Sequence, residues 1–212
     1  MKDLPVFTTD HGVASLGLKQ IPYNATAYIT LHDSLQTEKL IKECCDFCIA
    51  AGAESVYASG HDCFKDYPLH TAILLKQCLR KRLADTDADL IPVQAATLED
   101  FRNLYNDAMK AVHNASFVST VDAKKILEEG NGYFVYRETK LIGIGVAAGK
   151  RIEAIVSVMP GCGEDVLFAL NRVLIGPYAE VEVASTNTRA LRLYDRLGFE
   201  TVSVLSEWYK IF

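Results

Sequence analysis

Strand-like and helix-like segments alternate through the C-terminal part of the sequence, and their order is the strongest restriction on the fold. From about residue 91, a strand-like run and two amphipathic segments lead to three strand-like runs that short turns separate. Another helix, a strand, a last helix and a final strand-like run follow. Strands that alternate with helices around a central meander predict an α/β fold, with helices on both faces of a mixed sheet.

The helices of this part are marked by apolar spacing and by the residues at their ends. Apolar side chains recur at helical spacing over 98–112, and Thr97 is the expected N-cap of that helix. The next helix is expected to end at Gly130, and a third apolar stripe covers 166–174. Each stripe predicts a helix that buries one side against the sheet.

The last helix lies between two strand-like runs, AEVEVAS and TVSVLSEWYKIF. Asn187 stands at the expected N-cap, and Gly198 marks the expected end. Tyr194 lies two turns into the helix, where core packing is the alternative to a functional role.

This helix segment, NTRALRLYDRLGF, resembles the C-terminal signature of the GCN5-related N-acetyltransferase (GNAT) family, in which a strand leads into Asn-x-x-Ala-x-x-Leu-Tyr-x-x-x-Gly-Phe. The matching positions are Asn187, Ala190, Leu193, Tyr194, Gly198 and Phe199. The resemblance covers residues 91–212 and extends to the order of the elements. It implies an acyl-CoA N-acyltransferase-like fold with a mixed α+β sheet, in which two central parallel strands splay apart and acetyl-CoA enters the gap.

The resemblance also implies roles for residues around that gap. Tyr194 would be the general acid that protonates the departing thiolate, since a phenol has a reference pKa of about 10 and a thiol one of about 8.5. Asn187 would cap its helix and bond the pantetheine arm of acetyl-CoA. Backbone groups of Val156, Ser157 and Val158 would pair with that arm as an added strand does.

The loop that would hold the diphosphate departs from the family pattern. Gly161, Cys162 and Gly163 supply a Gly-x-Gly run, but the family's arginine or glutamine and the intervening residues are missing. Glu164 and Asp165 fall in the first helical turn, where they would repel a diphosphate. Two functions therefore stay open: an N-acetyltransferase, and a non-catalytic acetyltransferase-like binding or interaction module with a vestigial coenzyme A loop.

A general base is the least defined part of the predicted site. Glu153, near the start of the splayed strand, is our candidate, and Glu182 on the neighbouring strand is a second one. For each, an ordinary exposed strand carboxylate is the competing interpretation. His113, just after the first helix, is a weaker candidate on the substrate side.

Residues 1–85 predict a smaller N-terminal α/β lobe. Two strand-like runs with a helix between them repeat the order found over 154–183, which suggests a degenerate half-copy of the acetyltransferase-like domain at 91–212. We assign no chemistry to this lobe, because it has no counterpart of the last helix. An acidic, small-residue stretch places the boundary near residue 90.

The composition of the chain limits the classes of molecule that we expect it to bind. A net charge of −5 argues against nucleic acid and anionic membranes and suits an amine, so we expect a small-molecule or peptide amine substrate and acetyl-CoA as co-substrate. No apolar stretch reaches the ~18 residues of a membrane span, and the N-terminus has no signal core, so a cytoplasmic protein is expected. The six cysteines then predict reduced thiols without a metal site, and a homodimer stays an open alternative.

Overall fold

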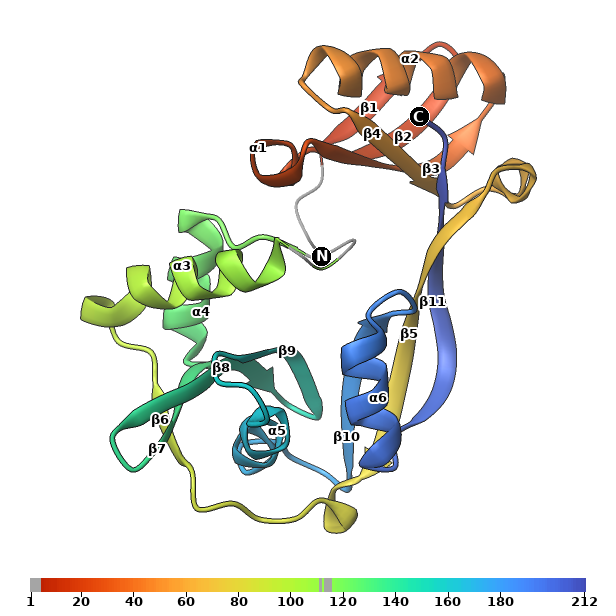
Figure 1. Cartoon of the computed structure of the whole chain (residues 1–212). Helices are drawn as coiled ribbons and strands as arrows, with labels where there is room; N and C mark the ends of the chain where they lie inside the picture. The colour runs from red at the N-terminus through yellow and green to blue at the C-terminus, as the bar shows by residue number, and fades with distance from the viewer. Residues whose placement is uncertain (1–4, 111, 113–115) are drawn as a thin grey trace. The chain divides into compact units, whose positions relative to one another are not determined.

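The computed structural model describes residues 5–110, 112 and 116–212, and the chain divides into two compact units (Figure 1). The N-terminal unit comprises Met1–Ile73 and Leu205–Phe212, and the C-terminal unit comprises Leu74–Val204. His113 lies outside the described residues, so its predicted role stays a prediction.

The N-terminal unit is a sheet with one long helix. Its elements are β1 (Val6–Thr9), β2 (Gly12–Gly17), α1 (Ile21–Asn24), β3 (Thr26–Ser34), α2 (Thr37–Ala50), β4 (Ser55–Ser59), a 3₁₀ turn at Asp62–Asp66 and the end of β11 (Glu200–Lys210). The strand order is β1-β2-β3-β4-β11, in which β3 and β4 are parallel. Helix α2 buries Leu40, Cys44 and Cys48 in the core of this unit. Burial raises the pKa of the Cys44 thiol to about 12.

The C-terminal unit holds the elements whose order was expected over 91–212, together with segments that precede them. They are β5 (Leu69–Leu79), 3₁₀ turns at Arg80–Arg82 and Ala95–Thr97, β6 (Asp89–Pro92), α3 (Leu98–Met109), α4 (Thr120–Glu129), β7 (Gly132–Arg137), β8 (Lys140–Ala148), β9 (Arg151–Ser157), α5 (Gly163–Asn171), β10 (Tyr178–Ala184), α6 (Thr188–Arg196) and the start of β11. The strand order is β11-β5-β10-β9-β8-β7-β6. The predicted mixed α/β sheet is therefore confirmed.

The helix ends follow the predicted rules with one exception. The Asn187 side chain accepts a hydrogen bond from the Ala190 N–H at 3.1 Å, and Gly130 ends α4 with a left-handed backbone, at a φ of 63°. Thr97 precedes α3 as expected, but its hydroxyl donates to the Gln94 carbonyl oxygen at 3.2 Å instead of capping α3.

Helices cover both faces of the C-terminal sheet. Helix α5 lies against β8 because Gly143 and Gly145 leave room for it; a Cβ at Gly143 would overlap Val166, and one at Gly145 would overlap Leu170. Ile144 lies between these glycines, so its side chain points to the opposite face of the sheet. There it packs in a cluster with residues of α3 and α4.

Two strands, β5 and β11, each contribute residues to both units. Strand β5, which the sequence did not predict, lies between β10 and β11 in the C-terminal unit, and the end of β11 pairs with β4, Tyr209 opposite Ala58. The compact units consequently divide inside these strands and not between residues 85 and 91. The origin of 1–85 as a degenerate copy stays a prediction.

No helix in the described part of the chain is long and apolar enough to span a membrane.

Candidate functional site

The parallel strands β9 and β10 separate after a short shared ladder (Figure 1). Arg151 pairs with Glu180 and Ile152 with Val181, and the described chain shows no further pair between these strands. The remaining residues of both strands diverge toward their carboxyl ends. In open sheets, ligands bind at the carboxyl ends of strands where neighbours diverge.

A β-bulge lies at the point of separation. On the other side of β9, Val146 pairs with Ala154 and Ala147 pairs with Ile152, so Glu153 is the extra residue. A bulge bends its strand and increases the local twist. Because pairing with β10 ends at Ile152, we attribute the separation of the strands to the bend at Glu153.

The backbone N–H and C=O groups of successive β9 residues point alternately toward β8 and toward the side where β9 and β10 separate. The Val158 N–H donates to the Ile142 oxygen at 3.0 Å, so it is used within the sheet. By the antiparallel alternation, Val156 also points its backbone groups toward β8, and those of Ile155 and Ser157 point toward the open edge. Of the three residues predicted to contact pantetheine, Ser157 faces the open edge with its backbone groups, while Val156 and Val158 face β8; the contacts themselves stay a prediction.

The loop after β9 leads into the N-terminus of α5. Gly161 has a φ of 86°, which favours glycine, and the Cys162 N–H donates to the Met159 oxygen at 3.3 Å. The N–H groups of Gly163, Glu164 and Asp165 form the first helical turn and have no acceptor in the described part of the chain. These groups are free to donate to an anion.

The two carboxylates of this turn are both paired with arginines. Glu164 accepts from Arg196 Nε at 2.7 Å, and Asp165 lies 2.5 Å from Arg137 Nη2 and accepts from the Thr86 hydroxyl at 3.0 Å. The expected repulsion of a diphosphate is reduced, because each negative charge has a cation beside it. The Glu164–Arg196 pair also links the start of α5 to α6.

Tyr194 lies on the buried side of α6, in the hydrophobic cluster of the C-terminal unit. Its side chain is buried, and its ring centroid lies 5.5 Å from that of Phe199. Burial raises the pKa of Tyr194 to about 12, so the phenol keeps its proton at neutral pH. Within the described residues, the hydroxyl has no hydrogen-bond partner.

The acidic residues of the separated strands differ in their partners. Glu182 is bound by Arg151 at 2.5 Å, and the buried Glu180 by Lys150 at 2.8 Å. Glu153 is exposed and makes no ion pair or hydrogen bond with the described chain. Of the two base candidates that the sequence suggested, Glu182 is thus engaged in an ion pair and Glu153 is not; a role as base stays a prediction.

Tyr105, which sequence reasoning did not single out, lies near Glu153. It is buried on α3, and burial, followed by the charge of Glu153, raises its pKa to about 12. The signal that could have found it is its position on the apolar side of that helix, opposite the strand that bulges. The charge of Glu153 thus influences a residue of α3, Tyr105. Tyr194, in contrast, packs in the hydrophobic cluster that contains α5.

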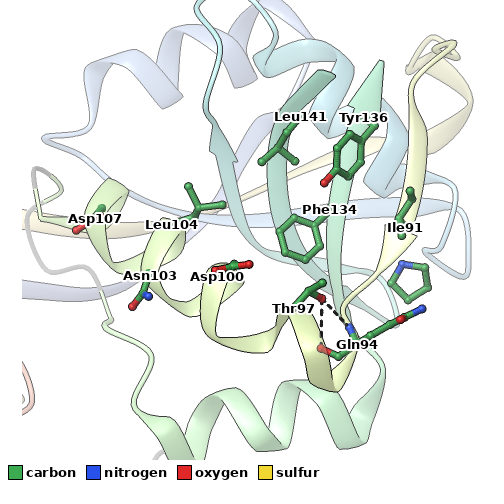
Figure 2. A pocket seen from close by; sticks show the side chains of 11 residues that line it. Ile91, Gln94, Thr97, Asp100, Asn103, Leu104, Asp107, Phe134, Tyr136 and Leu141 are labelled. Atoms are coloured by element: carbon green, nitrogen blue, oxygen red, sulfur yellow. Dashed lines mark hydrogen bonds between the residues drawn. The ribbon is translucent and has the colours of Figure 1, made fainter. Parts of the chain in front are cut away.

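A separate pocket of about 620 Å³ lies between α3 and the strands β6, β7 and β8 (Figure 2). Figure 2 shows Asp100, Leu104 and Asp107 along one side of α3, with Phe134 and Tyr136 of β7 across from them. None of the residues that line it comes from β9, β10, α5 or α6.

The described residues hold no cluster of histidine, cysteine and carboxylate side chains that could bind a metal.

The comparisons with known proteins identify the fold. The sequence matches no family model and no curated protein. A functionally unknown conserved protein from Staphylococcus epidermidis is 15% identical, with a TM-score of 0.61, over 99% of this chain and 94% of that one. A putative acetyltransferase from Pyrococcus horikoshii is 12% identical, with a TM-score of 0.57, over 95% and 69%.

A GCN5-related N-acetyltransferase from Kribbella flavida is 9% identical, with a TM-score of 0.58, over 96% of this chain and 58% of that one. At these identities the likeness concerns architecture. Together with the separated strands, it shows that the chain has the GCN5-related N-acetyltransferase fold.

Proposed function

We propose that this protein is an N-acetyltransferase that moves an acetyl group from acetyl-CoA to a primary amine by direct attack. The observation that carries the proposal is the separation of β9 and β10 at Glu153, directly before a helix N-terminus with free N–H groups. An extended arm fits along an unpaired strand edge, and an anion fits at such a helix end.

This chain offers groups for two parts of acetyl-CoA, the pantetheine arm and the diphosphate. Backbone groups of Ile155 and Ser157 would bind the pantetheine arm, and the N–H groups of Gly163 and its two successors the diphosphate. Asn187 uses its oxygen as a cap and keeps its amide N–H groups for the arm. Acetyl-CoA, when bound, supplies an activated acetyl thioester.

Proton transfer would involve two side chains on different sides of the sheet. Tyr194 holds a proton on its hydroxyl oxygen for the departing sulfur, and general acid catalysis of this kind contributes ~10²–10⁴-fold. Glu153, exposed and unpaired, would accept the proton of the amine through water. The net charge of −5 favours the approach of a cationic small molecule or peptide amine.

Two measurements test the proposal. Acetyl-CoA at a hundred-fold excess over its Kd should stabilise the fold by about 2.7 kcal/mol, and thermal unfolding with and without it measures this. Release of free coenzyme A thiol with a panel of primary amines measures transfer. Binding without transfer to any amine would favour the non-catalytic module, and no thermal shift at millimolar acetyl-CoA would refute the proposed site.

A further inference from the structure

Lys76 is a buried lysine in β5, the strand that comes from the part of the chain before residue 91. Its side chain is 6% exposed. Its Nζ lies 2.9 Å from Asp195 Oδ1 and donates to the Thr201 hydroxyl at 3.1 Å. Burying an ammonium is unfavourable unless it is paired and hydrogen-bonded, so these contacts determine where the amine can lie.

The contacts of Lys76 join three elements of the C-terminal unit. Lys76 belongs to β5, Asp195 to α6 and Thr201 to β11. Asp195 directly follows Tyr194 in α6. Successive residues of an α-helix are about 100° apart around its axis, so directing Asp195 toward Lys76 also sets the direction of Tyr194.

Packing and polar contacts both hold α6. The Tyr194 ring meets Phe199 in a tilted arrangement, and other apolar side chains of α6 pack against the same core. Among the described residues, the other side-chain polar links of α6 are its Asn187 cap at one end and the exposed Arg196–Glu164 pair at the other. Of these links, the Lys76–Asp195 pair has a buried member, the lysine, and it acts one residue from the phenol.

We infer that Lys76 is a positioning residue for Tyr194: it holds α6 in the rotation that sets the direction of the phenol. The catalytic consequence rests on the proposed acetyl transfer, whereas the positioning itself does not. The segment before residue 91, to which the sequence assigned no chemistry, thereby contributes to the site through β5.

The test follows the Tyr194 side chain directly, by NMR of protein labelled at the tyrosine Cζ carbons. The Tyr194 signal is identified by its loss in Tyr194→Phe. Lys76→Met and Asp195→Ala should each move this signal and leave most other tyrosine signals in place. Asp195→Asn keeps an acceptor for the lysine and should retain the native signal, as should the control Lys42→Met, which breaks an exposed pair on α2.

An unchanged Tyr194 signal in folded Lys76→Met and Asp195→Ala would overturn the inference, and so would a general shift of all tyrosine signals. Should Lys76→Met fail to fold, Asp195→Ala decides, because Asp195 is 62% exposed.

Kinetics then separate the inference from the proposed function. Lys76→Met should lower kcat about as much as Tyr194→Phe does, by about ten-fold or more, with an unchanged Kd for acetyl-CoA. In the Tyr194→Phe background it should lower kcat no further. Equal losses in both backgrounds would show a role independent of Tyr194. A wild-type protein that transfers no acetyl group, but whose Tyr194 signal moves in Lys76→Met, would refute the proposed function and retain the positioning role.

Discussion

The two glycines of β8 allow a quantitative test of how α5, and with it the free N–H groups of its first turn, is placed. In Gly143→Ala, the new Cβ would overlap Val166 and would lie 2.5 Å from the Val156 backbone oxygen. Neither atom is the end of a flexible side chain, so the helix or the strand has to move. Overpacking of this kind costs about 1–3 kcal/mol, and we expect the upper end because a backbone atom is involved.

The matched control is Gly130→Ala. Gly130 has a φ of 63°, and nothing lies within 4 Å of a Cβ there, so its cost is the backbone strain of about 1–2 kcal/mol. Thermal and urea unfolding measure both variants. A loss of about 3 kcal/mol corresponds to a fall in Tm of roughly 6–12 °C for a chain of this size.

A second change separates overlap from other causes. Val166→Ala in the Gly143→Ala background removes one of the overlapping groups, so the double variant should be more stable than the sum of the two single losses predicts. Gly143→Ala with wild-type stability, or strict additivity with Val166→Ala, would refute the close approach of α5 to β8.

Three further predictions concern the candidate site. Tyr194→Phe should lower turnover by about ten-fold or more with little change in the Kd for acetyl-CoA, and an unchanged rate would remove Tyr194 from the mechanism. Asn187→Ala should cost about 1 kcal/mol of stability through the lost cap and should also weaken acetyl-CoA binding, as calorimetry would show; loss of stability alone would limit Asn187 to capping. Burial raises the pKa of Tyr194 to about 12 from an unfolded value of about 10, so stability should fall as pH rises between these values, and Tyr194→Phe should reduce that fall in pH-dependent unfolding experiments. An equal fall in Tyr194→Phe would contradict the burial of its hydroxyl.

Local chemistry explains why the elements after residue 91 were predictable. The apolar stripe of α3, the Asn187 cap and the glycine at 130 each act within a few residues along the chain, and the structure retains them. The resemblance of the last helix supplied the expectation that two central parallel strands separate. Strand β5 escaped prediction because a strand pairs with distant segments, and its buried Lys76 interrupts an apolar pattern.

The chemistry of the candidate site depended more on tertiary contacts. The sequence placed Glu164 and Asp165 at the start of α5, but it did not show that Arg196 and Arg137 neutralise them from other elements. The bulge at Glu153 changes which backbone groups of β9 face outward, and a pairing register is set by both strands.

Amide hydrogen exchange along β9 tests most directly whether this edge is open and takes acetyl-CoA. In the free protein, the amides of Ile155 and Ser157 should exchange quickly, while those of Val156 and Val158, which bond to β8, should exchange slowly. Acetyl-CoA should slow the first two. Slow exchange of all four amides in the free protein, or no change with saturating acetyl-CoA, would contradict the account.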